Sequence, residues 1–287
     1  MTSRQSSAPS RSGFVSIVGR PNVGKSTLLN NIIGQKVSIV SNKVQTTRTQ
    51  VRAILNRGET QIVFVDTPGV NKPRTLLGER LNEAAYDAFG GVDLVIMVID
   101  ATQPMGEGDK FVAGRVPKGA LLVVNKVDQA SPEQTFEQLA AASSYEFEEY
   151  FPISAKTGDG VDNLVDNIAK RLPEGPAFYP DDVISDTPEA FWVAELVREQ
   201  LLAVLRDEVP HSIATRVTEW DWPRIRVEIL VERDSQKGIV IGKGGEILKE
   251  VGIRARRQMA EGVHLELFVK VDKDWQRQPK ALDKLGY

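Results

Sequence analysis

The segment Gly19–Ser26 reads Gly-Arg-Pro-Asn-Val-Gly-Lys-Ser and matches the phosphate-binding pattern G-x-x-x-x-G-K-[ST]. An apolar run, Phe14–Val18, precedes it, and a stretch of helical character, Lys25–Ile33, follows it. The glycines let backbone N–H groups reach phosphate oxygens, and the helix N-terminus adds a favourable potential. The pattern therefore predicts a nucleoside triphosphate site in which Lys25 reaches the β- and γ-phosphates and Ser26 binds Mg²⁺. The residues expected to line it are Gly19, Asn22, Val23, Gly24, Lys25, Ser26 and Thr27.

The tetrapeptide Asp66-Thr-Pro-Gly69 follows another apolar run. By itself it is typical of an ordinary type I turn. After a phosphate-binding loop, however, an aspartate at the carboxyl end of a strand lies beside the phosphates. We therefore expect Asp66 to hold Mg²⁺ through water and the Gly69 N–H to meet the γ-phosphate.

The tetrapeptide Asn125-Lys-Val-Asp128 follows the apolar run Ala120–Val124 and indicates which base is bound. The Asp128 carboxylate can accept hydrogen bonds from both N1–H and the exocyclic amine of guanine, a pair that adenine lacks. The aliphatic stem of Lys126 can cover one face of the base. Asn125 is expected to tie this loop to the phosphate-binding loop.

A fourth motif, Ser154-Ala-Lys156, follows a further strand and would offer the Ala155 N–H to the guanine oxygen. An isolated Asn-Lys-x-Asp is usually a solvated turn. Four motifs in this order, each at the end of a strand, predict a binding site for GTP and GDP.

The C-terminal third contains Ile239-Val-Ile-Gly-Lys-Gly-Gly-Glu-Ile247, in which Gly242–Gly245 is a Gly-x-x-Gly loop before a helix. Such a loop lets the backbone approach a sugar-phosphate chain, and KH domains use it to clamp about four single-stranded nucleotides. A helix–turn–helix with a glycine connector is the alternative, which the flanking isoleucines and the element order disfavour. The expected RNA contacts are Ile239, Ile241, Gly242, Lys243, Gly244, Gly245, Lys249, Arg254 and Arg257.

Charge supports RNA binding only locally. The net charge of the chain is −3, which is not typical of a nucleic-acid-binding protein. Around the glycine loop, basic residues outnumber Glu246 and Glu250; they are Lys237, Lys243, Lys249, Arg254, Arg256 and Arg257. This cluster suits a phosphate backbone, although a solvated helix face would look similar. The tryptophans at 192, 220, 222 and 275 are interpreted as packing residues rather than platforms for bases.

The elements that must position these motifs fall into two domains. From Gly13 to Leu172 strands alternate with helices, which predicts an α/β domain with a mostly parallel sheet covered on both faces. Three prolines in Leu172–Pro180 indicate a semi-rigid linker. From Thr187 a helix with Pro188 at its first position leads into the order α-β-β-α-α-β, a smaller α+β domain of the type II KH arrangement. The expected ranges are a disordered tail (1–12), a P-loop GTPase domain (13–173), a linker (174–186) and a KH domain (187–287).

The absence of cysteine excludes disulfides and thiolate metal sites and suits a reducing compartment. Apolar runs such as Leu94–Ile99 are far shorter than the ~20 residues of a membrane-spanning helix. The N-terminus lacks the apolar stretch of a secretory signal. We therefore expect a cytoplasmic protein.

Together with Gln45-Thr-Thr-Arg48, these motifs resemble the translation-factor-related GTPases. The likeness covers essentially the whole chain for a bacterial branch that adds a C-terminal KH domain. The resemblance implies that Gln45–Arg48 is the first switch loop. It also implies that Thr47, with Thr46 as the alternative, binds Mg²⁺ and the γ-phosphate. The catalytic residues on this interpretation are Lys25, Thr47 and Gly69, and the metal ligands are Ser26, Thr47 and Asp66.

The residue after Gly69 is Val70, where Ras-like GTPases use a glutamine to orient the attacking water. Intrinsic hydrolysis should be slow, or the water must be oriented in another way. Arg20 and Arg48 are candidates for an arginine finger by proximity alone. Related GTPases imply a second cation, K⁺, held partly by Asn22.

The resemblance further implies binding to the 3′ region of small-subunit ribosomal RNA and a role in assembly of the small ribosomal subunit. A monomeric protein is expected. Peripheral contact with the inner face of the cell membrane is a further expectation. One rival is a signalling GTPase whose KH-like domain docks on proteins. A second rival, an RNA-modifying enzyme, would need another catalytic constellation, and the sequence offers none.

Overall fold

The computed structural model describes residues 11–287, which divide into two compact units. The first unit contains residues 11–38, 47–72 and 81–186. The second contains 187–287 together with two short segments, 39–46 and 73–80. Residues 1–10 of the expected tail lie outside the described residues, whereas Arg11 and Ser12 already belong to the first strand.

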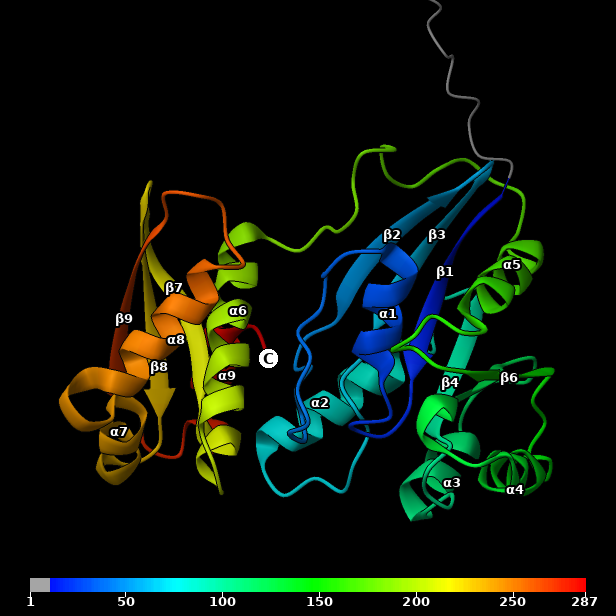
Figure 1. The fold of residues 1–287 in the computed structure, drawn as a ribbon, viewed down its shortest axis with the longest axis horizontal. Coiled ribbons are helices and arrows are strands. Elements are labelled where there is room, and N and C mark those ends of the chain that lie inside the picture. Colours follow the sequence, from blue (N-terminus) through cyan, green and yellow to red (C-terminus); the bar gives the residue numbers. More distant parts are fainter. Residues whose placement is uncertain (1–10) are drawn as a thin grey trace, which may run out of the picture. The chain divides into compact units, whose positions relative to one another are not determined.

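The first unit is built on a six-stranded sheet of order β2-β3-β1-β4-β5-β6 (Figure 1). Only β2 runs antiparallel to its neighbour, β3. The predicted α/β domain with a mostly parallel sheet is therefore confirmed. The strands are β1 (Arg11–Val18), β2 (Val51–Arg57), β3 (Thr60–Asp66), β4 (Leu94–Asp100), β5 (Leu121–Asn125) and β6 (Glu149–Ile153).

Both faces of this sheet are buried. Successive side chains of a strand point to opposite faces, so they enter two different apolar cores. Val15 and Ile17 of β1 belong to one apolar core, and Val18 belongs to the core of the other face. Helices α1 and α5 pack into the first core, whereas α3 and α4 supply the second. The helices are α1 (Lys25–Ile33), α2 (Leu76–Asp87), α3 (Glu107–Ala113), α4 (Pro132–Ala142) and α5 (Val161–Arg171). The sequence did not predict α3, whose seven residues are too few to show a helical period.

The second unit is an α+β KH domain with a three-stranded sheet of order β7-β8-β9, in which β8 pairs antiparallel with β7 and parallel with β9. Its core lies between this sheet and helices α6 and α8. The elements are α6 (Glu189–Val204), β7 (Ala214–Asp221), β8 (Arg224–Val231), α7 (Asp234–Ile241), α8 (Glu246–Arg256), β9 (His264–Val271) and α9 (Pro279–Leu285). The α-β-β-α-α-β order is as predicted, and α9 is an addition.

The predicted position of Pro188 in its helix was wrong, and the tryptophans differ in burial. Pro188 occupies the cap position before α6 rather than its first helical position. Trp275 is fully buried, and its Nε1 donates to the Ser212 carbonyl at 2.9 Å, as a packing residue should. The side chains of Trp220 and Trp222, at the β7–β8 turn, are 40% and 57% exposed and therefore lie outside the core.

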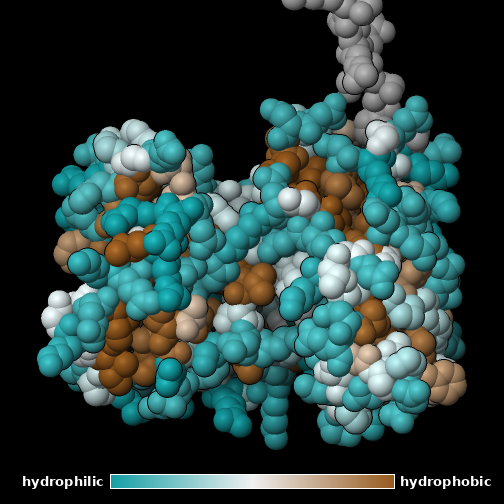
Figure 2. Space-filling view, in the orientation of Figure 1, coloured by the Kyte–Doolittle hydropathy of each residue, from teal (hydrophilic) through white to brown (hydrophobic). Residues whose placement is uncertain are grey.

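Polar side chains dominate the visible surface of each unit, and apolar residues form separate patches (Figure 2). Within residues 11–287, no helix is both long enough and apolar enough to cross a bilayer.

Candidate nucleotide and RNA sites

The phosphate-binding loop spans residues 19–24, between the end of β1 and the start of α1. Asn22 and Gly24 adopt positive φ angles of 66° and 100°, which turn the loop tightly into the helix. Gly69 lies so close to this loop that a Cβ atom would come 2.6 Å from the Pro21 nitrogen. Any larger residue at 69 would push the two motifs apart. The fold therefore brings the loop and Gly69 together, as the sequence predicted.

Lys25 is buried at the base of the loop. Its Nζ donates to the carbonyl oxygens of Gly19 at 3.0 Å and Arg20 at 2.9 Å. Burial lowers the pKa of Lys25 to about 8, against the opposing effect of Asp66. Phosphate oxygens beside this ammonium would supply the negative charge that the loop carbonyls lack.

Four oxygen-bearing side chains converge next to Lys25. The Asp66 Oδ2 atom accepts hydrogen bonds from Ser26 Oγ at 2.7 Å and from Ser38 Oγ at 3.0 Å. Thr47 Oγ1 lies 3.0 Å from Ser26 Oγ and 3.4 Å from Asp66 Oδ2. Burial raises the pKa of Asp66, although Lys25 and the three hydroxyls oppose the shift. The other carboxylate oxygen, Oδ1, is buried and has no hydrogen-bond partner among the described residues.

This donor set fits Mg²⁺, which prefers oxygen ligands and takes few of them from the protein when phosphates and water complete its shell. The unsatisfied Asp66 Oδ1 could accept a hydrogen bond from a water bound to the metal. Residues 11–287 contain no cluster of three or more His, Cys, Asp or Glu side chains that could hold a metal instead. Sequence reasoning missed Ser38, which belongs to no motif and reaches Asp66 only through the fold.

The two neighbouring threonines differ in orientation. Thr46 Oγ1 donates to the Lys43 carbonyl at 2.7 Å, so it is turned back toward its own loop. Thr47 is buried beside Ser26 and Asp66. The geometry therefore favours Thr47 over Thr46 as the ligand of the metal.

Asn125 joins three of the four motifs. Its Nδ2 donates to the Val23 carbonyl at 2.8 Å, and its Oδ1 accepts from the Ala155 N–H at 2.9 Å. Both bonds are buried, so they fix the base-binding loops to the phosphate-binding loop. Thr27 continues from that loop into α1.

Asp128 lies at the rim, where its Oδ1 accepts from Ser154 Oγ at 2.7 Å. This hydrogen bond lowers the pKa of Asp128, which keeps the carboxylate ionised as an acceptor. Lys126 Nζ donates to Asp100 at 2.6 Å and to the Asn22 carbonyl at 2.8 Å, which anchors its stem across the loop. Lys156 is exposed beyond the motif.

Neither of the two arginines considered as fingers is free to act in the observed arrangement. Arg20 Nε pairs with the buried carboxylate of Asp109 at 2.7 Å. Arg48 is only 3% exposed and is already engaged in an interaction of its own. Val70 is buried at 2% exposure, in agreement with its apolar side chain.

The second site is the Gly242–Gly245 loop between α7 and α8. Gly242 cannot carry a side chain, because a Cβ atom would lie 2.7 Å from the Ile247 side chain. Gly244 and Gly245 have positive φ, and nothing lies within 4 Å of where their Cβ atoms would be. The backbone is therefore open to a ligand at the N-terminus of α8, where N–H groups point outward.

The expected RNA contacts outside the loop lie on the helices that flank it, α7 and α8, with Arg257 at the C-terminal end of α8. Ile239 is 49% exposed, and Ile241 is partly exposed. Lys243, Lys249, Arg254 and Arg257 are exposed. Arg254 also pairs with Glu250 at 2.5 Å, so part of its charge is already balanced. The arrangement suits an exposed phosphate chain.

Comparisons with known proteins divide the chain in the same way. A family model described as a 50S ribosome-binding GTPase matches residues 14–126, and one described as a KH domain matches residues 208–276. The chain is 46% identical over 290 aligned residues to GTPase Era from Clostridium botulinum (strain Alaska E43 / Type E3), covering 96% of this chain and 98% of the relative. GTPase Era from strain Eklund 17B / Type B gives the same identity and coverage.

Two solved structures are similar over nearly the whole chain. One is Era in complex with MgGDPNP and nucleotides 1506–1542 of 16S ribosomal RNA, at 39% identity and a TM-score of 0.93, covering 96% of this chain and 99% of that one. The other is a variant of Aquifex aeolicus Era bound to GDP·AlF4⁻, at 40% identity and a TM-score of 0.92 with the same coverage.

Proposed function

The chain belongs to the GTPase Era family and is a GTP-hydrolysing enzyme with a KH domain, and from that premise we propose that GTP controls its binding to the 3′ region of small-subunit ribosomal RNA. The nucleotide half of this proposal is carried by Asn125, whose two buried hydrogen bonds join the phosphate-binding loop to both base-binding motifs. A chance set of four turns would not converge in this way.

In the reaction that we propose, Lys25 holds the β- and γ-phosphates, and the Gly69 N–H donates to the γ-phosphate. Ser26 and Thr47 bind Mg²⁺ directly and Asp66 binds it through water. The metal neutralises charge that develops on the transferred phosphoryl group. Asp128 and the Ala155 N–H select guanine. These assignments are supported by the contacts among Ser26, Thr47 and Asp66.

Val70 cannot orient the attacking water, because its side chain has no polar atom. We propose that Asn22 would help to hold a K⁺ ion, which would supply positive charge near the phosphates in place of an arginine finger. The pairing of Arg20 with Asp109 supports a cation other than that arginine.

For the RNA half, the open backbone at Gly244 and Gly245 is the supporting observation. A related Era has been crystallised with nucleotides 1506–1542 of 16S ribosomal RNA, and we infer that this chain binds the corresponding region during assembly of the small ribosomal subunit. We propose that the protein acts in the cytoplasm as a monomer.

The test is crosslinking in cells, followed by sequencing of the bound RNA. Reads should concentrate near the 3′ end of small-subunit ribosomal RNA and should decline when the Gly242–Gly245 loop is disrupted. An even distribution over cellular RNA, or reads that are unaffected by the loop variant, would contradict the proposal.

A further inference from the structure

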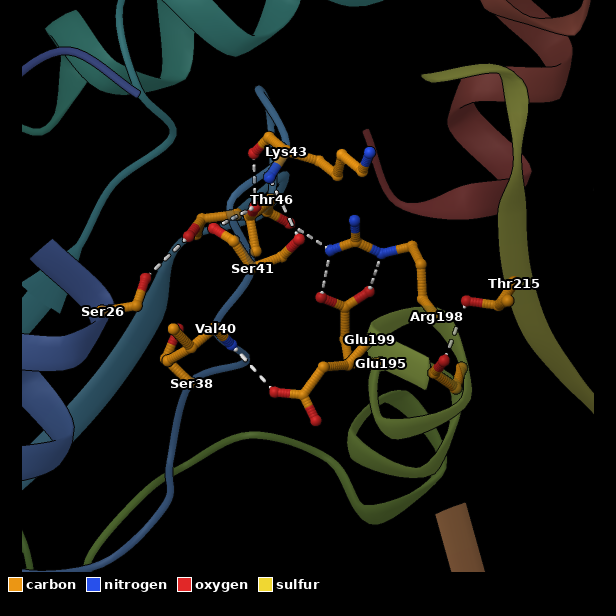
Figure 3. Close-up of polar contacts among 12 residues, drawn as sticks. Ser26, Ser38, Val40, Ser41, Lys43, Thr46, Glu195, Arg198, Glu199 and Thr215 are labelled. Carbon is orange, nitrogen blue, oxygen red and sulfur yellow. Dashed lines mark hydrogen bonds and ion pairs between the residues drawn. The ribbon is translucent and has the colours of Figure 1, made fainter. Parts of the chain in front are cut away.

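Residues 39–46, which precede the switch threonine Thr47, are held by helix α6 within the second unit. Ile39 is buried in the apolar core that α6 helps to form. The Val40 N–H donates to Glu199 Oε1 at 2.9 Å, and Arg198 Nη2 donates to the Thr46 carbonyl (Figure 3). Arg198 and Glu199, two successive residues of α6, therefore form hydrogen bonds with both ends of this segment.

Arg198 is oriented for this contact by Glu195, one turn earlier on α6. Arg198 Nε donates to Glu195 Oε1 at 2.7 Å, and Nη2 donates to Oε2 at 2.6 Å, a bidentate pair (Figure 3). The Arg198 side chain is completely buried. Burying an ion pair seldom adds stability compared with apolar residues of similar volume. The pair with Glu195 instead fixes the Arg198 guanidinium in one orientation, directed at the Thr46 carbonyl.

The next residue along the chain is Thr47. Its hydroxyl lies 3.0 Å from Ser26 Oγ, in the cluster assigned to Mg²⁺. Consecutive Cα atoms are about 3.8 Å apart, so fixing the Thr46 carbonyl restricts where the Thr47 side chain can be. The Thr46 hydroxyl closes its own loop on the Lys43 carbonyl, which leaves the peptide between Thr46 and Thr47 little freedom.

We propose that Arg198, oriented by Glu195, is a positioning residue for GTP hydrolysis. By holding the Thr46 carbonyl, it keeps Thr47 where Mg²⁺ and the γ-phosphate are bound. This inference rests on the proposed function, which assigns Thr47 to the metal and the γ-phosphate. Arg198 of α6 is thus added to the residues that fix the first switch loop next to Thr47. Because only the triphosphate has a γ-phosphate, losing Arg198 should weaken its binding and leave GDP binding unchanged.

The test uses the full-length double variant Glu195→Leu/Arg198→Leu. Replacing both partners avoids a buried unpaired charge, whereas Arg198→Ala alone would leave Glu195 without its partner. The matched control is Thr215→Val, which removes a buried hydrogen bond of 2.9 Å from Thr215 Oγ1 to the Ala194 carbonyl of the same helix. That bond does not involve residues 39–46. Thermal unfolding identifies any variant that fails to fold.

Affinities for GDP and for GDPNP, measured with Mg²⁺ by competition against a fluorescent nucleotide, form the first readout. In the double variant we expect GDPNP to bind about tenfold more weakly, within the range of typical coupling between sites, while GDP affinity is unchanged. Under steady-state turnover, kcat should fall more than KM rises. The control should keep the ratio of the two affinities of the parent. A folded double variant with the parental ratio would overturn the inference.

A second readout needs no nucleotide. Lys43 lies inside the held segment and is partly exposed, so trypsin cleavage after it reports release of the segment. Cleavage should be faster in the double variant and unchanged in Thr215→Val. Equal cleavage rates in the double variant and the parent would also overturn the inference.

Thr47→Ala distinguishes the metal-binding role of Thr47 from the positioning role of Arg198. If it leaves the ratio of GDPNP to GDP affinity unchanged, the assignment of Thr47 fails, and the positioning role of Arg198 fails with it. If it changes the ratio while the double variant does not, only the positioning role is overturned. A change in both supports both.

Discussion

At the scale of single residues, the nucleotide site combines buried fixed contacts with exposed recognition groups. Asn125 is 2% exposed and holds the loops together, whereas Asp128 lies at the rim with its carboxylate accessible to a ligand. The residue that joins the loops is therefore distinct from Asp128, which we propose reads the base. Substitutions at the rim should change specificity without unfolding the domain.

The first prediction concerns Asp128→Asn. The amide offers one acceptor and one donor where guanine needs two acceptors, so GTP should bind about 100-fold more weakly, the equivalent of about 3 kcal/mol for hydrogen bonds to a charged group. Xanthosine triphosphate, which has an oxygen at C2, should bind better than GTP. Competition binding with both nucleotides measures the switch, and Asp159→Asn, an exposed carboxylate nearby, is the control. Parental GTP affinity would show that Asp128 does not read guanine.

The second prediction concerns the cation at Asn22. Replacing K⁺ with Na⁺ should lower the rate of GTP hydrolysis by about tenfold or more, because K⁺ is proposed to take the role of a charge-stabilising finger, and loss of about 1.4 kcal/mol of such stabilisation is tenfold in rate. Asn22→Ala should remove the difference between the two salts. Nucleotide affinity measured in each salt separates binding from turnover. Equal rates in K⁺ and Na⁺ would contradict the proposed role of K⁺ and of Asn22 in holding it.

At the scale of elements, each site is placed where a glycine turn meets the N-terminus of a helix. The phosphate-binding loop precedes α1, and the Gly242–Gly245 loop precedes α8. Both arrangements expose backbone N–H groups to an anion. The two helices belong to different units, so the two sites should be separable by substitution.

The third prediction makes that separation with Lys243→Asp/Gly244→Asp. Gly244 has a φ of 62°, a region that Asp tolerates, and nothing lies within 4 Å of its Cβ position, so the fold should survive. Two carboxylates where phosphates should lie are expected to reduce RNA affinity by at least about tenfold, since phosphate contacts dominate such affinity. Intrinsic GTP hydrolysis should be unchanged. Filter binding and phosphate release measure the two activities.

The matched control for this variant is Lys280→Asp/Lys284→Asn on α9. It changes the net charge by the same amount at exposed positions away from the glycine loop. RNA affinity should fall much less in the control. If both variants lose the same affinity, net charge rather than the glycine loop governs binding. Loss of GTP binding in the folded loop variant would contradict the assignment of the two sites to separate domains.

At the scale of the whole molecule, the segment between the domains is not a free tether. The Pro176 carbonyl accepts from Ser12 Oγ at 2.6 Å, and the Tyr179 carbonyl accepts from Gln61 Nε2 at 2.8 Å. Residues 174–186, expected as a linker, are thus bound along the first unit, and the chain passes to the second unit at residue 187. A change in the first switch loop can reach the KH domain through residues 39–46, which α6 holds.

The fourth prediction is reciprocal coupling between GTP and RNA. RNA affinity should differ about 5- to 150-fold between protein loaded with GDP and protein loaded with a non-hydrolysable GTP analogue, and RNA should tighten binding of the analogue by the same factor. Titration of RNA in each nucleotide state measures the effect. Salt must be matched, because phosphate contacts make the affinity strongly salt-dependent. Dissociation constants that agree within error would exclude the switch.

The sequence by itself determined the two domains, the mostly parallel sheet and the four nucleotide motifs. These features depend on short-range rules: the period of apolar residues, glycines where backbone must approach a phosphate, and functional residues placed directly after strands. Helix α1 was predicted with its observed bounds, Lys25–Ile33, because its helical period lies within that one segment. The loop Gly242–Gly245 was likewise visible as a local pattern.

Only the tertiary structure decided which side chains meet across long stretches of chain. Ser38 reaches Asp66, Arg20 pairs with Asp109, and Arg198 holds the carbonyl of Thr46. The fold also distinguishes Thr47 from Thr46, because adjacent threonines have the same local pattern and differ only in what the fold places beside each hydroxyl; this difference supports the proposed role of Thr47. Such contacts depend on how packed elements orient single side chains, and no periodicity or motif within one segment encodes that orientation.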